Sequence, residues 1–383
     1  MTRIYSSILF CFFLLSCAKP GQEATTLNES VDYHFEATSS FTQFDPIVHL
    51  AIVETDDDLI FGSVNQIQLL SDGSLLAFDP NLITIHHFDS LGNVLHRIGR
   101  EGSGPGEFSN EAIIRSDGKK VYVFERVASK VEVFEFQHQT WVHQRTISID
   151  KVDEDVPQTL LKADENDLWF IYRHFYQGAN GARLAKDHIT KVSMSQESES
   201  LAYDTWLAEL PQTEAIFEDL GGFIASYPKP FGPRSISAIT SEGHIILSKT
   251  DRFRFSRVIS EIDSTFIFQM DVPNILLSDA QKNNMTGYSE RIHALIRDHM
   301  PEVRPSTIPI ILPDEKNGFW VGYESIDFDE RRWLYVNHDN QISKEIRLPA
   351  NFRPHVAIDR MIYGVLSNED GSQSIIGYSL HRT

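Results

Sequence analysis

The sequence predicts an all-β fold built from six similar four-stranded antiparallel sheets. Short corners made of acidic residues, asparagine or glycine recur at intervals of 45, 49, 76, 75 and 43 residues. An apolar run follows each corner, and strand-like runs alternate with turn residues between Asp72 and Phe108. Repeats of about 40 to 50 residues are typical of β-propellers, whose sheets form a ring of blades. The corners are Asp72-Gly73, Asp117-Gly118, Asn166-Asp167, Glu242-Gly243, Asn317-Gly318 and, as a degenerate sixth corner, Arg360-Met361.

The runs after the corners are apolar at successive positions, as expected where both faces of a sheet are covered. They cover Leu75 to Phe78, Val121 to Phe124, Leu168 to Tyr172, His244 to Leu247, Phe319 to Tyr323 and Ile362 to Leu366. Six corners with six runs predict six blades, and the two long intervals predict insertions of about 30 residues. The last blade lacks a fourth strand, so we expect Ile47 to Glu54 to pair there and close the ring.

The stretch from Asp72 to Phe108 resembles one repeat of NHL-type β-propellers. The matching positions are Asp79, Ile85, Phe88, Asp89, Gly92, Leu95, Gly99, Gly102, Gly104, Pro105, Gly106 and Phe108. The Asn-His-Arg triple that names the family would fall on Leu82, Ile83 and Thr84. The resemblance is therefore to the broader set of six-bladed NHL-like propellers, many of them bacterial lipoproteins of unassigned function. It implies a fold and says little about chemistry.

The glycine-rich segment GSGPGEF, residues 102–108, has two interpretations. As a link between blades, it needs positive φ angles and close backbone approach, which Gly102, Gly104 and Gly106 permit. Phe108 would then fill the gap between blades. As a phosphate loop, it would need a following Lys-Ser/Thr and a helix, and the sequence provides neither. The structural interpretation is favoured.

The first residues predict a signal for export. Arg3 supplies a positive charge, and the apolar stretch from Ile8 to Leu15 is too short to span a bilayer. Leu14-Leu15-Ser16-Cys17 resembles a bacterial lipobox, in which the cysteine is lipidated, whereas an ordinary secretory peptide is the alternative. We expect a signal peptide over 1–16, a lipidated N-terminus and flexible tether over 17–45, and the propeller over 46–383. Ala18 is compatible with an outer-membrane location in the cell envelope.

The charge of the chain argues against one class of partner. The formal net charge is −20, and such a surface repels phosphate backbones unless it carries a local basic patch. No nucleic-acid partner is therefore expected. The only cysteines are Cys11 and Cys17, so the folded part is expected to contain no disulfide.

The predicted insertions fall on one face of the ring. In a four-stranded blade, the link between the second and third strands and the link to the next blade lie on the same side. The predicted insertions occupy these two kinds of link and cover residues 173–187, 210–235, 275–306 and 324–332. Repeat proteins commonly bind partners on such a face. A helical insertion is expected between blades 4 and 5, where Ser278 to Met300 carries an apolar stripe.

Candidate ligand-binding residues come from this face and from the channel. The segment Ser226 to Ser235 offers Tyr227, Phe231 and Arg234, which suit a peptide, a glycan or a carboxylate. His355, at the start of the last inner strand, is the histidine best placed to reach the channel. Each has an ordinary structural alternative, as a loop anchor or a hydrogen-bonded histidine.

Catalytic patterns are few. The 15 histidines show no metal-ligand spacing, the acidic clusters lack the pattern of a Ca²⁺ loop, and no Gly-x-Ser-x-Gly occurs. The leading hypothesis is a lipid-anchored module that binds a peptide, glycan or envelope protein, with no cofactor and no catalytic or metal-binding residues assigned. The NHL-like resemblance implies an alternative, because some such propellers are zinc-dependent lyases. That metal-assisted lyase or hydrolase would use His355 and loop carboxylates. A purely structural partner in an envelope complex is a third possibility.

Overall fold

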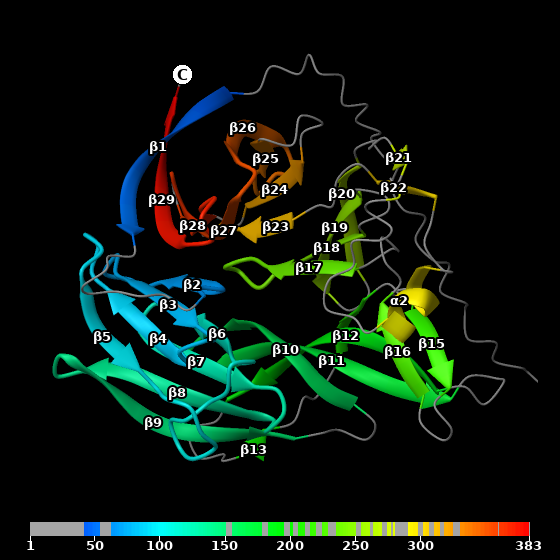
Figure 1. Ribbon diagram of the computed structural model, residues 1–383, viewed down its shortest axis with the longest axis horizontal. Helices are drawn as coiled ribbons and strands as arrows, with labels where there is room; N and C mark the ends of the chain where they lie inside the picture. The colour runs from blue at the N-terminus through cyan, green and yellow to red at the C-terminus, as the bar shows by residue number, and fades with distance from the viewer. Residues whose placement is uncertain are drawn as a thin grey trace, which may run out of the picture. The chain divides into compact units, whose positions relative to one another are not determined.

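Four-stranded antiparallel sheets repeat along the chain in the order that the corner spacing predicts (Figure 1). The computed structural model describes residues 42–53, 63–150, 155–177, 183–194, 200–201, 206–210, 215–219, 224–228, 235–249, 254–260, 263–269, 274–276, 279, 290–297, 302–305, 310–314, 318–324, 330–358 and 360–382. All of them belong to one unit, residues 32–383.

The first three blades follow one another directly. Blade 1 contains β2 (Gln66–Leu69), β3 (Leu75–Asp79), β4 (Thr84–Phe88) and β5 (Val94–Ile98). Blade 2 contains β6 (Ile113–Ser116), β7 (Lys120–Glu125), β8 (Lys130–Gln137) and β9 (Thr140–Ile149), with the short β13 (Ser200–Leu201) added in parallel to β9. Blade 3 contains β10 (Asp155–Ala163), β11 (Asp167–Gln177), β12 (Arg183–Ser193) and β14 (Trp206–Glu209).

The last three blades complete the ring. Blade 4 contains β17 (Ser235–Ile239), β18 (Ile245–Lys249), β19 (Arg254–Ser260) and β20 (Asp263–Gln269). Blade 5 contains β23 (Ile310–Pro313), β24 (Phe319–Glu324), β25 (Glu330–Val336) and β26 (Ile342–Pro349). Blade 6 contains β27 (Phe352–Ile358), β28 (Met361–Ser367), β29 (Gln373–Arg382) and β1 (Thr42–Val53). Each apolar run predicted after a corner lies in the second strand of its blade, except that His244 comes just before β18.

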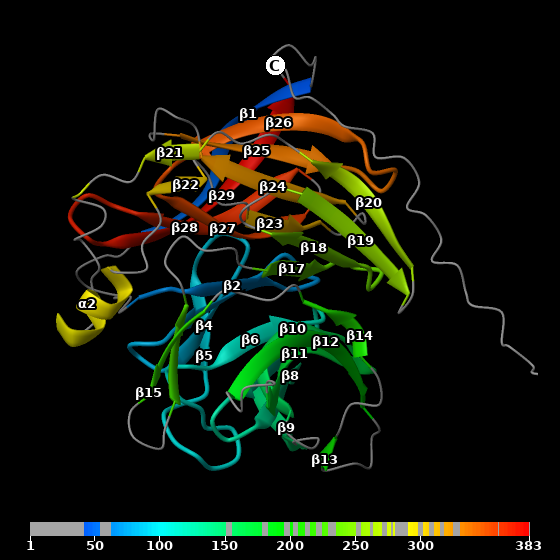
Figure 2. The same ribbon diagram turned by 90° about the vertical axis from the view of Figure 1, so that its right-hand side faces the viewer.

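The ring closes through strand β1, which comes from the start of the propeller and joins its last blade. β1 pairs antiparallel with β29, from Phe44 opposite Arg382 to Val53 opposite Ser374. This confirms the predicted pairing, which begins earlier in the chain than the expected Ile47. The first residues of β1, Thr42 to Phe44, also pair in parallel with β26 and so join blades 5 and 6 in one sheet (Figure 2).

Strand β1 has one buried side and one exposed side. Ile52 is 5% exposed and belongs to a core cluster with Leu75, Phe88 and Val365, so it packs between the last blade and the first. Val48, on the same strand, is 53% exposed. The closing strand therefore contributes to the core as well as to the ladder.

We predict that Ile52→Ala destabilises the protein by about 2 to 4 kcal/mol, because truncating a buried isoleucine leaves a cavity. The matched control Val48→Ala should change the free energy of unfolding by less than about 0.5 kcal/mol. Urea unfolding followed by tryptophan fluorescence measures both variants. Equal effects of the two substitutions would contradict the role assigned to β1.

The glycine-rich link between blades 1 and 2 is a tight turn packed around Phe108. Phe108 is fully buried and meets the ring of Phe78 edge-on, with ring centroids 5.9 Å apart. A Cβ on Gly99 would lie 2.0 Å from the Phe108 ring, so only glycine fits there. Gly102 and Gly106 have positive φ angles, as expected. Gly104 does not, and a Cβ at this position would lie 3.1 Å from the Glu107 carboxylate.

Two charged side chains of β8 hold this link in place. The Nζ of Lys130 donates to the carbonyl oxygens of Ser103, Gly104 and Glu107 at 3.0 to 3.3 Å. Lys130 also forms an ion pair of 2.6 Å with Glu132, whose side chain is fully buried. The Glu132 carboxylate accepts hydrogen bonds from the backbone N–H of Gly106 and the hydroxyl of Thr146. The segment is therefore a structural link, as the favoured interpretation predicts.

We predict that Glu132→Gln destabilises the protein by about 3 kcal/mol, because it leaves Lys130 without its buried counter-charge. Burial alone would raise the pKa of Glu132, but the hydrogen bonds from Lys130, Thr146, Gly106 and His143 outweigh it and lower that pKa. The ionised carboxylate therefore stabilises the native protein above the ordinary glutamate pKa of about 4.3, and this stabilisation is lost as the pH falls below it.

Urea unfolding between neutral and acidic pH tests this prediction. The wild-type protein should lose more stability on acidification than Glu132→Gln. The control Glu111→Gln, which removes an exposed ion pair to Arg126, should cost less than about 1 kcal/mol. A Glu132→Gln protein with the wild-type pH profile would refute the assignment.

Each of the two long intervals between corners contains an inserted segment, as predicted. The hairpin of β15 (Ala215–Asp219) and β16 (Ile224–Pro228) lies between blades 3 and 4. The ribbon of β21 (Asn274–Leu276) and β22 (Val303–Pro305) lies between blades 4 and 5. Between β21 and β22 is helix α2 (Glu290–Arg297), in which Ile296 is buried. The predicted helix is thus present over a shorter range than Ser278 to Met300 among the described residues.

The predicted insertion at 173–187 is different. Most of it extends strands β11 and β12, which pair without interruption up to Gln177 opposite Arg183. An insertion that continues the alternating pattern of its flanking strands lengthens the hairpin instead of forming a loop. None of the described helices is long and apolar enough to cross a membrane.

Candidate functional site

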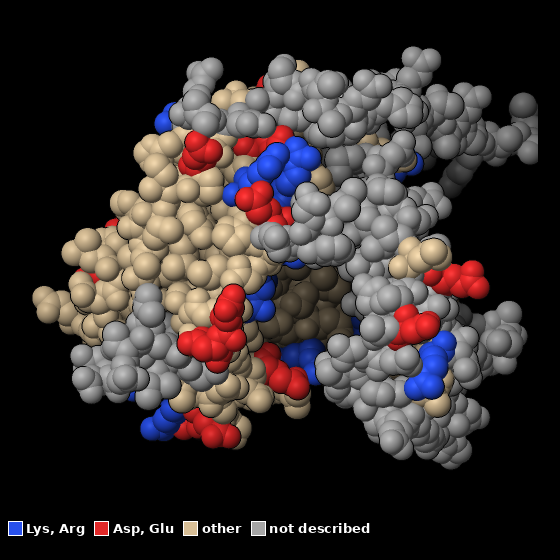
Figure 3. All heavy atoms as spheres, turned by 45° about the horizontal axis from the view of Figure 1, so that its top comes forward, with Lys and Arg blue, Asp and Glu red and all other residues tan. Residues whose placement is uncertain are grey.

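The innermost strands of the six blades surround a central cavity of about 580 Å³. Neighbouring inner strands contact each other all the way round the ring, from β2 through β6, β10, β17 and β23 to β27 and back to β2. In the space-filling view the molecule is hollowed, with basic and acidic side chains near the edge of the hollow (Figure 3). The cavity is of the size that holds a small ligand or the end of a larger one.

Two glutamines of β2 form part of the wall, and both are engaged within the protein. Gln66 accepts from the N–H of Ile114 and donates to the carbonyl of Ala112, both in blade 2. Gln68 accepts from the N–H of Ser116 and donates to the carbonyl of Ile67. These amides bind blade 1 to blade 2 and have little hydrogen-bonding capacity left for a ligand.

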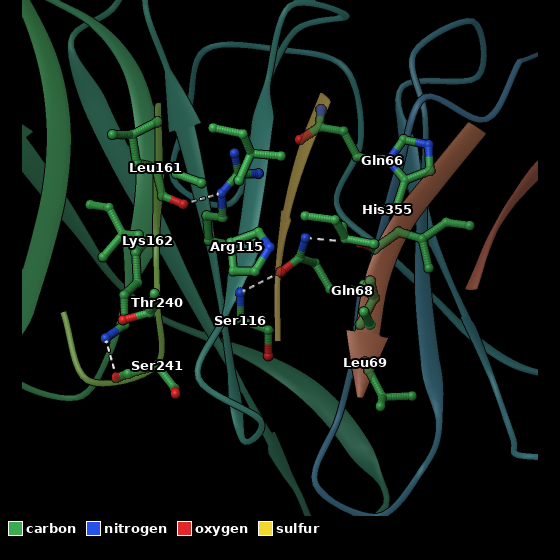
Figure 4. Close-up of a pocket in the computed structure, with 18 of the residues that line it drawn as sticks. Gln66, Gln68, Leu69, Arg115, Ser116, Leu161, Lys162, Thr240, Ser241 and His355 are labelled. Atoms are coloured by element: carbon green, nitrogen blue, oxygen red, sulfur yellow. Dashed lines mark hydrogen bonds between the residues drawn. The ribbon is translucent and has the colours of Figure 1, made fainter. Parts of the chain in front are cut away.

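Arg115 of β6 places a positive charge in the wall of the cavity (Figure 4). Its Nε donates to the carbonyl of Leu161 at 2.7 Å and its Nη1 to the carbonyl of Ile114 at 2.7 Å. In the described part of the chain no carboxylate pairs with it, and burial alone lowers its pKa to about 10. Arg115 therefore stays charged at neutral pH.

Irregular pairing at two inner strands shapes the wall near this charge. The register between β10 and β11 shifts between Leu160 and Lys162, so Leu161 stands outside the ladder, and its carbonyl is the acceptor for Arg115. The register between β27 and β28 shifts in the same way at His355. Such β-bulges re-aim a side chain or free a backbone group, and they are common next to functional sites.

His355 lines the cavity, as the sequence predicts for the channel. Arg353 donates from its Nε to the Nε2 of His355 at 3.2 Å, which requires an unprotonated Nε2. Burial, together with the positive charges of Arg353 and Arg115, lowers the pKa of His355 to about 3. His355 is therefore a neutral imidazole with its proton on Nδ1 at physiological pH. Arg353 itself also bonds to the carbonyl of Val64 in blade 1.

The remaining charged groups of the wall have partners. The Nζ of Lys162 donates to the carbonyl of Ser241 and lies 3.9 Å from the Asp164 carboxylate. Asp314 accepts a hydrogen bond from the hydroxyl of Tyr335 at 2.8 Å. The other lining side chains are mainly aliphatic or hydroxylic. Arg115 is thus distinguished, among the described lining residues, by having only carbonyl partners.

The other candidate residues from the sequence are not brought to this cavity by the described structure. Tyr227 lies in β16, where its backbone pairs with Ile216, and its side chain is not described. Phe231, Arg234 and the lipidation candidate Cys17 lie outside the described residues. Their roles stay predictions. Of the four ligand-binding candidates, only His355 has a described place in the cavity.

Arg115 was not among the residues singled out from the sequence, although a signal was present. The inner strand of each blade ends one or a few residues before its corner, and Arg115 lies two residues before Asp117-Gly118. A basic side chain near the end of an inner strand lies either in the wall of the channel or against the next blade. A search limited to histidines and to inserted loops does not find it.

Two histidine-containing clusters outside the cavity are structural networks. Trp141 donates from Nε1 to the Nδ1 of His87, whose Nε2 lies 3.0 Å from the Ser74 hydroxyl, and that hydroxyl bonds to Asp72 at 2.6 Å. Because Nδ1 accepts, the neutral imidazole must donate to Ser74, so His87 is not a base for this serine. The group is not a hydrolytic triad despite its composition.

A second pocket of about 410 Å³ lies on blade 3. Asp155 binds His174 and lies 3.2 Å from the Nε2 of His188, while Lys186 and Glu209 form an ion pair of 2.8 Å. His174, Lys186 and Glu209, which line this pocket, are therefore each engaged in an ion pair. Across the described part of the chain, no three histidine, cysteine or acidic side chains come together as a metal site would require.

Comparison with known proteins places the chain in a family. Residues 26–264 match the model of DUF5128, described as a 6-bladed β-propeller. The chain belongs to the DUF5128 family. The match ends within blade 4, and blades 5 and 6 continue the same architecture. No curated protein matches the sequence.

Solved structures resemble this DUF5128 protein in fold. A DUF4221 protein from Bacteroides vulgatus has 11% identity and a TM-score of 0.54, with 90% of this chain and 100% of that chain covered. A protein from Bacteroides fragilis described as exported has 11% identity, the same coverage and a TM-score of 0.49. Virginiamycin B lyase from Staphylococcus aureus has 13% identity, coverage of 86% and 98%, and a TM-score of 0.41. At 11% identity, the similarity to the DUF4221 protein concerns the fold alone.

We predict that the His355 imidazole does not titrate between pH 5 and 8. The lowered pKa means that the unfolded protein takes up a proton near the ordinary value of about 6.5 while the folded protein does not. His355 therefore reduces stability as the pH falls from about 6.5 towards 3, by up to about 1.4 kcal/mol per pH unit. His355→Gln should remove this contribution.

Histidine NMR titration and urea unfolding at several pH values measure these two effects. Arg115→Gln provides a second check, because removing that charge should raise the pKa of His355. A resonance of His355 that titrates near pH 6.5 would show that the imidazole is solvated and that the described environment is wrong.

Proposed function

We propose that this DUF5128 protein is a lipid-anchored binding module of the bacterial cell envelope. Its ligand is a small molecule, or the end of a peptide or glycan, held in the central cavity. The observation that carries the proposal is the cavity itself, whose wall combines aliphatic and hydroxyl residues with a few charged or amide groups from different blades. Ligand sites in proteins commonly have this composition.

The route of entry is the face that carries the insertions. The β15–β16 hairpin and the segment from β21 to β22 precede inner strands β17 and β23, so both attach where inner strands begin. The links to all inner strands lie on one side of the ring in this blade topology. A ligand entering there would pass the inserted segments before reaching His355 and Arg115. Tyr227, Phe231 and Arg234 belong to that part of the chain and are proposed as further contacts.

Binding is favoured over catalysis by the chemistry of the described wall. One histidine and one acid line it, and the acid, Asp314, is held by Tyr335. A metal-assisted lyase or hydrolase would need additional ligands converging on His355, and no described residues supply them. The proposed lipid anchor rests on the lipobox-like sequence ending at Cys17, and the proposed outer-membrane location rests on Ala18.

We predict that Ser237→Phe, which fills the cavity from β17, abolishes ligand retention. The protein is incubated with an extract of bacterial envelopes, repurified and denatured, and the released compounds are identified by mass spectrometry. Wild-type protein should release compounds that Ser237→Phe does not. The control Ser148→Phe, at an exposed position of β9, should behave like wild type.

Thermal unfolding of all three proteins verifies that the substitutions leave the fold intact. If the folded Ser237→Phe protein retained the same compounds as wild type, the ligand would not occupy the cavity. A wild-type protein that retained nothing above the level of Ser237→Phe would likewise refute the proposal.

A further inference from the structure

We propose that the ligand of the central cavity carries a carboxylate, which binds Arg115 and His355, and an apolar body that contacts the aliphatic wall. This inference rests on the proposed function and specifies the chemical class of the ligand. Three features of the cavity support it: unused donors on Arg115, the fixed tautomer of His355, and the distribution of the other polar groups.

Arg115 has donors to spare. A guanidinium has five N–H groups, and the bonds to Leu161 and Ile114 engage one on Nε and one on Nη1. Three N–H groups remain on Nη1 and Nη2. A charged donor within a low-dielectric cavity binds an anion more strongly than it binds water, and the planar guanidinium matches the two oxygens of a carboxylate.

His355 supplies a second donor of the right kind. The bond from Arg353 to Nε2 places the imidazole proton on Nδ1, so the neutral ring presents one N–H. A ligand acceptor is therefore suited to this histidine, whereas a ligand donor is not. Arg115 and His355 come from blades 2 and 6 and line the same cavity (Figure 4).

Other polar groups of the wall are engaged within the protein, including its one acid, Asp314, which accepts a hydrogen bond from Tyr335. Gln66 and Gln68 are engaged with the backbone of blade 2, and Lys162 is engaged with Ser241. The rest of the wall contains the partly exposed aliphatic residues Leu69, Ile113, Leu161, Ile311 and Val356, together with the hydroxyl residues Ser116, Thr159, Ser237, Thr240 and Ser241. Such a wall favours an apolar body behind a single anionic group.

The test compares phenylacetate with phenylacetamide, which have similar shapes and differ in charge. Isothermal titration calorimetry and thermal unfolding are measured with each probe. We expect phenylacetate to bind with a Kd of about 1 mM or tighter and phenylacetamide to bind at least about tenfold more weakly. Arg115→Gln should weaken phenylacetate about 10- to 100-fold, since a charge-assisted hydrogen bond is lost.

Control variants distinguish recognition from folding. Arg115→Lys keeps the charge and should retain more phenylacetate affinity than Arg115→Gln. Arg126→Gln removes an exposed arginine outside the cavity and should leave the Kd unchanged. If Arg115→Gln does not fold, the wild-type NMR titration decides, because bound phenylacetate should raise the pKa of His355 while phenylacetamide should not.

The outcomes separate this inference from the proposed function. Equal affinity for the two probes, or no binding of phenylacetate up to about 10 mM, would overturn the carboxylate preference. Retention of a neutral envelope compound that Ser237→Phe abolishes would then leave the cavity as a binding site with a different ligand class. Phenylacetate binding that is unaffected by Ser237→Phe would place the anion outside the cavity and also contradict the inference.

Discussion

Most blades of this propeller are separate sheets, so neighbouring inner strands are not joined by a continuous backbone ladder. Among the described strands, blades 5 and 6 alone share one sheet, because β1 pairs with the outer strand β26 and with β29. Elsewhere, side chains of one blade bond to the backbone of the next. Gln66 and Gln68 do so between blades 1 and 2, Arg115 between blades 2 and 3, Lys162 between blades 3 and 4, and Arg353 between blades 6 and 1.

These contacts explain why long polar side chains occupy a wall whose other residues are mainly aliphatic or hydroxylic. A buried backbone carbonyl without a partner is costly, and the carbonyl of Leu161 stands outside its ladder because the strand bulges there. Arg115 satisfies it from the next blade. The same requirement that holds the ring together therefore places a cation in the centre of a protein whose formal net charge is −20. Long-range attraction does not account for an anionic ligand here, so affinity must come from short-range contacts.

The fold was largely predictable because its signals are local. The corners after each inner strand are turns, and positive φ angles at Gly73, Gly118 and Gly243 match the glycines read from the sequence. The strands after them are buried and apolar, which periodicity detects. The ring closure by β1 was predictable because the sequence of the last blade provides only three strands. The predicted insertion at 173–187 is instead mostly an extension of β11 and β12. The number of residues between two corners does not distinguish an inserted loop from a longer hairpin.

The candidate site was less predictable because it depends on which residues of distant blades face one channel. His355 was found by its place in the last inner strand, whereas its tautomer depends on Arg353 and its pKa also on Arg115, which is 240 positions away in the sequence. Arg115 was missed because a single arginine in a short strand has no motif. Its significance appears only when its partners are known to be carbonyl oxygens.

The structural role of Arg115 also bears on binding energetics. A flexible surface arginine must lose side-chain freedom when it binds a ligand, and that loss reduces affinity. Here the Nε and Nη1 bonds already fix the guanidinium before a ligand arrives. The Arg353 bond likewise fixes the His355 ring. The donors that remain are therefore preorganised, and the bonds that join the blades prepare the cavity for recognition without a separate set of supporting residues.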